Sequence, residues 1–453
     1  MLSIFGVCSR PVAAVPEAPD RVRHTGGMRA QASASVIGVL LTAICTCVAG
    51  CSSTHGNKGA NSKTGASTKT VSVPPLDRGE LGQVLDEWMR RNTTPGAVVG
   101  VKVGDRAPVF VAAGEADRHT HARMSDTAAF RIGSVTKVFV GAVALQLSEQ
   151  RRLNLDATID RWLPRFPNAR RITVRQLLTH RSGLAPFWDD SGAPGPYSAV
   201  STAFVAAHLR RAFTTQEIVA FVKGRPLLSK PGTAVHYSNV NTILLGIIVS
   251  DVTHADLATA LHKRLLDPLG LPDTYYAATE HRAPAPTPGV MHIGGRVLDE
   301  SAIPDTGTVT ALGAAGAMVS TPRDLIAFST AYFRARVRGQ RNLSTSVFKI
   351  GPGGTGLGVE GFSGDGFCAL AAKGCPPGVS FFAVGATGSV PGGSAVVVYD
   401  SEYDLSVVAL ANSDQVDLAD LAEHAGLLTK LGTSAYEKSV GFTAHTVPTT
   451  VAG

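Results

Sequence analysis

Two pairs of β-rich runs, one near each end of the folded part of the chain, restrict the fold more than any other feature. Ala97 to Val103 and Pro108 to Ala113 are separated by Gly104-Asp105-Arg106, which predicts a β-hairpin. Far downstream, Ala395 to Tyr399 and Leu405 to Ala411 predict a second hairpin. Strands at both ends of a chain, with helices between them, indicate one sheet built from the two termini.

The segments around and between the hairpins are mainly helical in pattern. A helical pattern from Asp417 to Leu431 follows the second hairpin, and most of 134–270 is also helical in pattern. Ahead of the first hairpin lie apolar residues at helical spacing: Leu81, Val84, Leu85, Trp88 and Met89. The predicted fold class is therefore α/β (α+β), with an antiparallel sheet flanked by terminal helices and an all-helical part inserted between its strands.

Size and charge exclude several classes of protein. A chain of 453 residues with 44% hydrophobic content can bury a large core, and its length allows two or three domains. Most of the formal net charge of +7 comes from the N-terminus, because the first 75 residues hold seven of the 42 basic residues and two of the 35 acidic ones. The remaining 35 basic and 33 acidic residues nearly cancel. This balance gives no support to nucleic acid as a partner.

The N-terminal segment carries an export pattern. Residues 1–50 include a short apolar run, Val36 to Ile44, that follows Arg29, which is typical of a signal peptide. The segment ends in Val48-Ala49-Gly50-Cys51, which resembles the bacterial lipobox, whose cysteine is lipidated after cleavage. An ordinary signal peptide cut elsewhere and an uncleaved anchor are the alternatives. Met28 would be a normal start for such a peptide.

The expected division of the chain follows from this pattern. Residues 51–75 would be the lipidated Cys51 and a flexible tether, since 52–74 are mostly Ser, Thr, Gly, Lys and Asn. The folded domain is expected over 76–435, with its helical part at about 131–300 and a C-terminal tail at 436–453. We expect an exported domain held by lipid on the outer face of the bacterial cell membrane.

If the chain is cleaved before Cys51 and that cysteine carries the lipid, two other cysteines remain. An oxidising exterior would let Cys368 and Cys375 form a disulfide across a short loop, and two unpaired thiols are the alternative. The sequence contains neither a zinc-type cysteine cluster nor H-E-x-x-H, so no metal is expected.

Ser134 lies three residues before Lys137 at the start of an apolar helical segment. Residues three apart on a helix are neighbours, so this hydroxyl and this amine could share a proton. A serine is a poor nucleophile unless a base takes its proton, and burial lowers the pKa of a lysine toward that role. The same S-x-x-K spacing recurs at Ser346 and Lys349. For Ser134, a helix N-cap followed by an ordinary lysine is the structural alternative.

An ordered series of motifs favours Ser134 over Ser346. From about Glu80 to Ser413 the chain resembles the serine β-lactamase and penicillin-binding-protein superfamily, in particular its class C-like serine hydrolases, which include D,D-peptidases and esterases. Only Ser134 is followed by Y-x-N and a Gly-rich strand. The matching segments are Phe130 to Lys137, Leu153 to Asp156, Gln176 to Leu184, Pro231 to Thr233, Tyr237 to Asn239, Asp267 to Leu271, Ser320 to Leu325 and Gly356 to Gly358.

The resemblance implies roles for further residues. Tyr237 would act with Lys137 as the base, and which of the two takes the proton stays open because their titrations would be coupled. Asn239 would orient Lys137 and donate a hydrogen bond to a substrate amide or ester carbonyl. The backbone amides of Ser134 and Ser389 would form the oxyanion hole.

Two histidines lie near these motifs. We expect His180, in the Thr-His-Arg-Ser-Gly stretch, to cap a helix or form structural hydrogen bonds, and not to act as the base. His236 precedes Tyr237 and is expected at the surface of a strand or loop, with a catalytic role as the minor alternative.

The third motif departs from the family pattern. Where the family has Lys-Thr-Gly or His-x-Gly, this chain has Gly385-Ala386-Thr387-Gly388-Ser389, with alanine in place of the basic residue. Thr387 and Gly388 can still shape the strand and the oxyanion amide. The missing positive charge would have bound a substrate carboxylate. We therefore expect β-lactams and D-Ala-D-Ala termini to be poor substrates, and neutral esters or amides to be better ones.

The predicted function is a serine hydrolase that forms an acyl-enzyme on Ser134 and acts on an ester or amide at the cell envelope, as an esterase or as a D,D-peptidase-like or β-lactamase-like enzyme. No cofactor is implied. The expected partners are a small-molecule, peptide or ester substrate, the membrane through the lipid anchor, and peptidoglycan. One alternative is a catalytically inactive binding lipoprotein that keeps the fold, for which Ala386 is the best support. The other is a scaffold for cell-wall assembly.

Overall fold

The computed structural model describes residues 73–186, 208, 210–293, 296–299, 306–333, 358, 360–362 and 383–440. The chain divides into two units, Met1–Ser67 and Thr68–Gly453, and every described residue belongs to the second. Cys51, Ser346, Cys368 and Cys375 lie outside the described residues, and the predictions made for them stay predictions.

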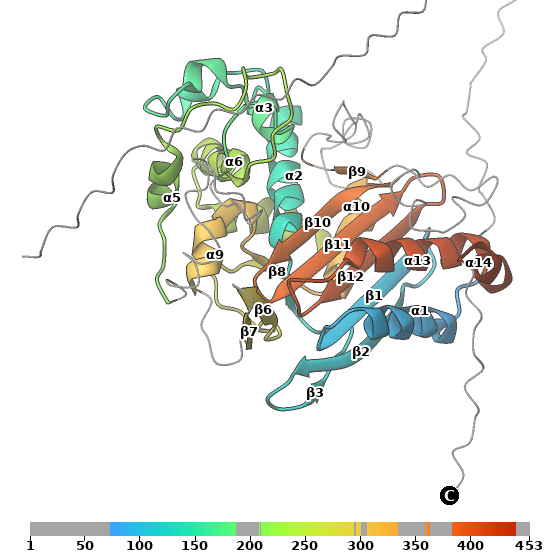
Figure 1. The fold of residues 1–453 in the computed structure, drawn as a ribbon. Coiled ribbons are helices and arrows are strands. Elements are labelled where there is room, and N and C mark those ends of the chain that lie inside the picture. Colours follow the sequence, from blue (N-terminus) through green and yellow to red (C-terminus); the bar gives the residue numbers. More distant parts are fainter. Residues whose placement is uncertain are drawn as a thin grey trace, which may run out of the picture. The chain divides into compact units, whose positions relative to one another are not determined.

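A seven-stranded antiparallel sheet joins the two ends of the described chain (Figure 1). Its order is β3-β2-β1-β12-β11-β10-β9. The central pairing runs from Ala97↔Ala411 to Val103↔Leu405, so the first strand of the domain lies beside the last. The strands are β1 (Gly96–Val103), β2 (Val109–Asp117), β3 (Ala122–Arg123), β9 (Glu360–Phe362), β10 (Ala383–Val390), β11 (Gly393–Asp400) and β12 (Leu405–Ala411). Both predicted hairpins are confirmed.

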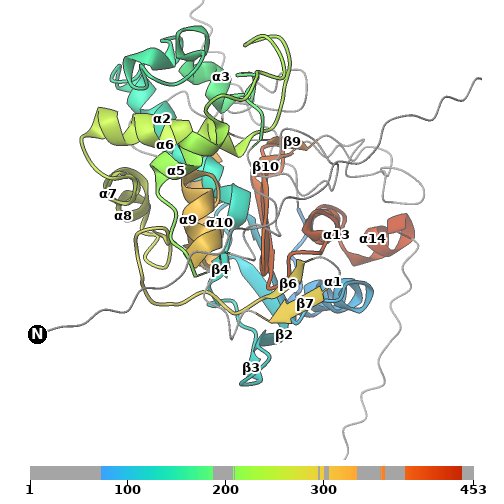
Figure 2. The ribbon, with the colours of Figure 1, turned by 60° about the vertical axis from the view of Figure 1, so that its left-hand side comes forward.

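The sheet is covered on both faces, as Figure 2 shows. Helices α1 (Arg78–Arg91) and α13 (Leu418–Leu431) pack on one face, and α14 (Thr433–Val440) follows α13. Alternating strand residues separate the two cores, because Val407 and Ala409 face α1 and α13 whereas Val408 and Leu410 face the inserted helices. Both β11 and β12 are buried along their whole length, which explains why most of their residues are apolar.

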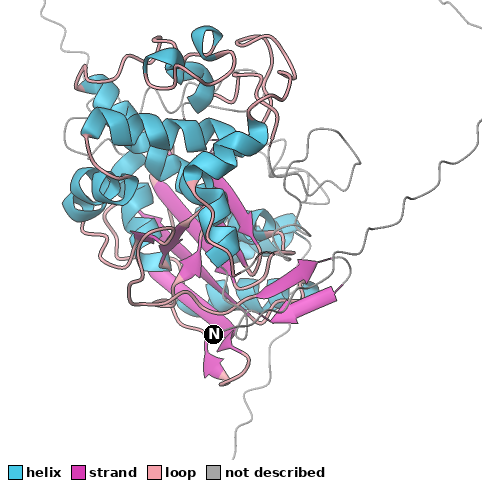
Figure 3. Ribbon diagram, turned by 90° about the vertical axis from the view of Figure 1, so that its left-hand side faces the viewer, coloured by secondary structure: helices cyan, strands magenta, loops and turns pink. Residues whose placement is uncertain are grey.

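The inserted part covers the other face with helices, drawn in cyan in Figure 3. At its centre are α2, buried from Thr136 to Leu147, and α6, buried over most of its length. The helices are α2 (Thr136–Glu149), α3 (Val174–Leu178), α5 (Thr215–Val222), α6 (Asn239–Thr253), α7 (Leu257–Leu261), α8 (Asp267–Leu269), α9 (Thr306–Leu312) and α10 (Pro322–Phe333). Short 3-10 turns, η1 (Gly133–Val135) and η6 (Gly313–Ala315), precede α2 and follow α9.

The structure departs from the sequence predictions in three places. The inserted part is not purely helical, because it contains a small sheet of β4 (Phe130–Arg131), β8 (Met318–Ser320) and β5 (Tyr275–Tyr276), and a hairpin of β6 (Val290–Ile293) and β7 (Arg296–Asp299). Between α2 and α3 the chain forms only two 3-10 turns, Ile159–Arg161 and Ala169–Arg171. Helix α10 extends the inserted part beyond residue 300. Runs of two or three strand residues are too short to give a periodic signal.

Among the described residues no single helix has the length and apolarity needed to cross a membrane. The pair Asn239–Thr253 and Leu257–Leu269 meets the criterion on length and composition together, with a bend of 75° between its parts.

Candidate active site

Ser134 lies in the tight turn η1, directly ahead of α2. The backbone of Ile132 donates to the carbonyl of Met318 at 3.0 Å, and the Met318 amide donates to Thr136 Oγ1 at 3.1 Å. These two contacts fix the turn to β8. The N-cap of α2 is Val135, which makes no side-chain cap bond. The N-cap alternative for Ser134 is therefore wrong, and its hydroxyl faces other partners.

The Ser134 hydroxyl lies between an amine and a phenol. Lys137 Nζ donates to Ser134 Oγ at 2.7 Å, and Tyr237 Oη lies 2.7 Å from the same atom. Lys137 is 7% exposed, whereas Tyr237 is 45% exposed. Lys137 Nζ also lies 5.0 Å from the centre of the Tyr237 ring. The three side chains that the sequence predicted for catalysis therefore meet at one oxygen, although Tyr237 comes from the loop just before α6, 103 positions from Ser134.

Lys137 is held by a backbone carbonyl and not by Asn239. Its Nζ donates to the Ala315 carbonyl, on η6, at 2.8 Å. Asn239 is 9% exposed, and in the described part of the chain its Oδ1 has no hydrogen-bond partner. The predicted contact by which Asn239 orients Lys137 is therefore wrong, because the Ala315 carbonyl occupies that role. Asn239 keeps an unsatisfied carboxamide oxygen, which is closed off from solvent and is not part of the wall of the Ser134 pocket.

His180 holds in place the Tyr237 loop, the short segment just before α6 that carries Tyr237 and Ser238. Its Nδ1 accepts hydrogen bonds from the Ser238 amide at 3.3 Å and from Asn241 Nδ2 at 3.0 Å. Its ring stacks on that of Tyr237 with centroids 4.7 Å apart. Asn241 Oδ1 in turn accepts from Ser182 Oγ at 2.5 Å. The prediction that His180 is a hydrogen-bonding residue is confirmed.

The electrostatics of His180 fit this supporting role. Burial, and after it the positive charge of Lys137, lower the pKa of His180 from 6.5 to about 3. The imidazole is therefore neutral at ordinary pH, and since Nδ1 accepts two hydrogen bonds, the proton resides on Nε2. His236, by contrast, is partly buried, and its backbone amide donates to the carbonyl of His180 at 2.8 Å.

Strand β10 lies directly against the turn that carries Ser134. A Cβ on Gly388 would lie 2.1 Å from the Ile132 carbonyl oxygen and 2.8 Å from the Ser134 amide nitrogen. A Cβ on Gly133, whose φ is +49°, would lie 3.0 Å from the Ser389 amide nitrogen. Glycine at both positions lets the two backbones approach this closely. The Ser389 side chain donates to the Asp414 carbonyl at 3.1 Å.

The pocket beside Ser134 is mostly apolar. Ala386, 5% exposed, occupies the third-motif position in its wall. Apart from Lys137, the described residues of the wall include no Asp, Glu, Lys or Arg. The wall consists of Ser134, Lys137, Val138, Leu177, Leu178, His180, Tyr237, Thr242, Leu245, Gly358 and Ala386. The pocket therefore suits an uncharged acyl group better than a carboxylate.

Two contacts in the site were not predicted from the sequence. The Ala315 carbonyl is a backbone group, which every residue possesses, and it lies 178 positions from Lys137. The support of His180 by Asn241 was likewise not predicted, although both residues lie in or next to recognised motifs. In the part of the chain that the structure describes, no group of three His, Cys, Asp or Glu side chains is placed to bind a metal ion.

Comparisons with known proteins agree with this architecture. Residues 81–430 match the Beta-lactamase family. Esterase EstB of Burkholderia gladioli is 32% identical over 206 residues, which cover 44% of this chain and 52% of the esterase. The match thus spans about half the length of that curated relative.

Two solved structures cover more of the chain. A D-stereospecific amidohydrolase from Streptomyces sp. superimposes with a TM-score of 0.63 and 26% identity, over 79% of this chain and 100% of that one. The D-amino acid amidase of Ochrobactrum anthropi SV3 gives a TM-score of 0.60 and 27% identity, over 74% and 91%.

Proposed function

The chain belongs to the beta-lactamase family, and we propose that it is a serine hydrolase which transfers an acyl group from a neutral ester or amide to Ser134 and then to water. The observation that carries this proposal is the position of Ser134 Oγ, 2.7 Å from both Lys137 Nζ and Tyr237 Oη. A hydroxyl in contact with two groups that can hold its proton is a typical activated nucleophile.

The proposed reaction has two steps. In the first, Ser134 Oγ attacks the substrate carbonyl carbon, its proton passes to the Lys137 and Tyr237 pair, and the leaving alcohol or amine departs with a proton from that pair. In the second, water attacks the ester carbonyl and gives a proton to the same pair, the bond between the acyl group and Ser134 Oγ breaks, the pair returns a proton to Oγ, and the acid leaves. The amides of Ser134 and Ser389 would bind the oxyanion in both steps. Because Lys137 and Tyr237 both contact Ser134 Oγ, they act as one coupled base.

The substrate class follows from the wall of the pocket. Ala386 supplies no cation to bind a carboxylate, and the neighbouring leucines and valine favour an apolar acyl group. The similarity to an esterase and to two amidohydrolases supports ester or amide cleavage. In this proposal Asn239 donates a hydrogen bond from its carboxamide nitrogen to the carbonyl of an amide or ester substrate.

The proposed location rests on the N-terminal sequence. Lipidation of Cys51, followed by the polar segment 52–74, would hold the domain on the outer face of the cell membrane. Substrates at the cell envelope, peptidoglycan among them, would then be within reach of the tethered domain.

Ala386 also favours a second candidate, a binding lipoprotein that has lost catalysis, because one charged group of the family site is absent. A fluorophosphonate probe, followed by intact-mass spectrometry of the full chain, distinguishes the two. We expect one adduct that is lost in Ser134→Ala and kept in Ser346→Ala, the matched change at the other S-x-x-K serine. Absence of an adduct on folded protein would support the binding lipoprotein.

A further inference from the structure

A second and larger cavity lies among the inserted helices, beside a different face of α6 from the pocket of Ser134. Its volume is about 720 Å³, which is within the usual size of small-molecule sites. Helix α5 packs there against α6 and α9 (Figure 2). The apolar part of its wall includes Leu163, Phe213, Ile218, Ile243, Ile247 and Leu257. We call this space the α5–α6 cavity.

One polar group lies deep in the wall of this cavity. Tyr276 is only 7% exposed, and its hydroxyl has no hydrogen-bond partner among the described residues. Burial raises the pKa of this phenol above its ordinary value of 10, so it remains protonated and can donate. The hydroxyl lies over η6, 3.4 Å from the place where a Cβ on Gly313 would be. This donor, which no described protein group pairs, can therefore bond to an acceptor on whatever fills the cavity.

The charged groups of the wall are peripheral. Lys223 and Asp256 both line the cavity at exposed positions. Asp256 already caps α7 by accepting from the Thr259 amide at 2.8 Å. No charge therefore lies in the apolar interior of the cavity among the described residues, and a charged occupant would be desolvated without compensation.

The α5–α6 cavity shares a wall with the catalytic lysine. Thr242 and Leu245 of α6 face the pocket of Ser134, whereas Ile243 and Ile247 face the cavity. Gly313 and Ala314 of η6 line the cavity, and the next residue, Ala315, holds Lys137 Nζ through its carbonyl.

Helix α6 and the turn η6 are packed closely against each other. A Cβ on Gly246 would lie 2.6 Å from the Cβ of Ala314. An occupant that presses on η6 would therefore move the Ala315 carbonyl, because η6 cannot retreat into α6.

We propose that the α5–α6 cavity binds a neutral, largely apolar small molecule which carries one hydrogen-bond acceptor for Tyr276, and that this ligand changes the reactivity of Ser134 through the turn Gly313–Ala315. The site goes beyond the hydrolase function proposed above, since neither the nucleophile nor the acyl pocket takes part in binding.

Binding is tested with prodan, an uncharged naphthyl ketone whose fluorescence reports an apolar environment. The full chain carrying Cys51→Ser is used so that no attached lipid competes for the probe, and Ser134→Ala is added so that no acyl transfer occurs. We expect saturable binding. Ala278 lines the cavity, and Ala278→Trp, which would place an indole in that space, should raise the Kd at least about tenfold. Tyr276→Phe should raise it about fivefold, the contribution of one hydrogen bond.

The matched control is Ala122→Trp, an exposed position on β3 outside the cavity, which should leave the Kd unchanged. Unchanged binding in both Ala278→Trp and Tyr276→Phe would overturn the site. If Ala278→Trp fails to fold, as judged by circular dichroism, Tyr276→Phe alone decides, because it keeps the shape of the ring.

The link to Ser134 is measured as the rate of fluorophosphonate labelling with and without saturating prodan, with Ser134 intact. We expect at least a twofold change in rate that is abolished in Ala278→Trp. An equal rate with and without prodan would overturn the link while the binding result stands. If Ser134 is not labelled at all, the proposed hydrolase function fails, whereas the titration still decides whether the cavity is a ligand site.

Discussion

The imidazole of His180 lies flat against the phenol of Tyr237, with ring centroids 4.7 Å apart and planes 24° apart. His180 itself does not contact Ser134. Through the stacking it holds the phenol of Tyr237, which does contact Ser134. His180 itself is held by two hydrogen bonds to Nδ1, one of them from the backbone of Ser238. The Tyr237 loop therefore depends on a neutral imidazole, and protonation of that ring would break both bonds.

Because the imidazole of His180 is neutral in the folded protein, the stability of the protein should depend on pH. Its pKa is about 3 in the folded protein and 6.5 in the unfolded chain, so the unfolded chain binds more protons between these values. Stability should fall as the pH drops from about 6.5 toward 3, by on the order of a few kcal/mol. His180→Gln should reduce the difference in urea midpoint between pH 7 and pH 4. An equal difference in both proteins would contradict the assignment.

Removal of the Lys137 amine should strongly reduce the reactivity of Ser134 without unfolding the domain. Lys137→Met keeps a chain of similar length in a buried position and removes the group that contacts Ser134 Oγ. We expect fluorophosphonate labelling to slow by about 10²- to 10⁴-fold, which is the usual contribution of a general base to a reaction rate. Tyr237→Phe should also slow labelling. Lys263→Met, on the helical segment before α8, serves as control and should label at the normal rate.

A methyl group at Gly388 should separate β10 from the turn of Ser134. The added Cβ would lie 2.1 Å from the Ile132 carbonyl oxygen, so the strand must shift and the Ser389 amide with it. We expect Gly388→Ala to slow labelling of Ser134 at least about 100-fold, as expected for loss of an oxyanion donor. Gly82→Ala, in α1, meets nothing within 4 Å and should instead stabilise the protein by about 0.5–1 kcal/mol.

A basic residue at position 386 should shift selectivity toward carboxylates. Ala386→Lys places an ammonium in the wall of the Ser134 pocket, where it would bind a substrate carboxylate. We expect the ratio of nitrocefin to neutral ester turnover to rise at least tenfold over the unmodified protein, measured as kcat/KM. Efficient nitrocefin turnover by the unmodified protein would contradict the role given to Ala386.

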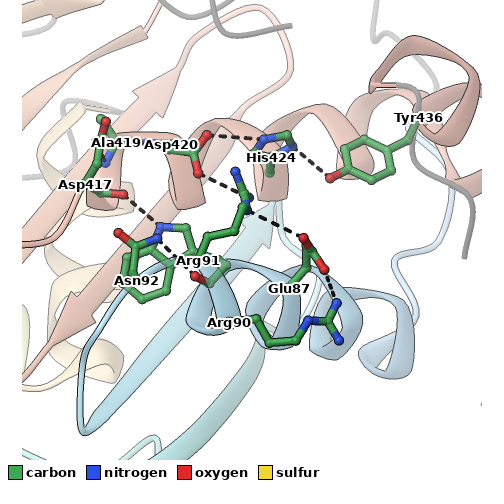
Figure 4. Close-up of polar contacts among 10 residues, drawn as sticks. Glu87, Arg90, Arg91, Asn92, Asp417, Ala419, Asp420, His424 and Tyr436 are labelled. Carbon is green, nitrogen blue, oxygen red and sulfur yellow. Dashed lines mark hydrogen bonds and ion pairs between the residues drawn. The ribbon is translucent and has the colours of Figure 1, made fainter. Parts of the chain in front are cut away.

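Glu423, on α13, should make the protein less stable in alkali. It lies next to the network of Arg91, Asp420 and His424 that joins α1 to α13 (Figure 4). The side chain is 2% exposed, and among the described residues its Oε2 has no partner. Burial, followed by the charges of Asp420 and Asp417, raises the pKa of Glu423 from 4.5 to about 8.

Because the folded state holds this proton more tightly, stability should fall as the pH rises from 4.5 to 8 and then level off. Glu423→Gln should remove that part of the fall, seen as a smaller change in urea midpoint between pH 5 and pH 9. Glu87→Gln, in the same interface but hydrogen-bonded to Arg90 at the surface, should keep the unmodified pH dependence.

Much of the fold was predictable because its signals are local. The hairpins and the helix ending near Leu431 follow from periodicity and turn residues, and the structure confirms them. The small sheet of β4, β8 and β5 was not predictable, since its strands have only two or three residues and pair across long separations.

The sequence by itself determined the pairing of Ser134 with Lys137, because helix geometry brings residues three positions apart onto one face. The family resemblance placed Tyr237 beside them, 103 positions from Ser134. Only the tertiary structure decided that Lys137 is held by the Ala315 carbonyl and not by Asn239. The physical reason is that this contact depends on how α2 packs against η6, and every residue carries a backbone carbonyl, so the sequence does not single out this one.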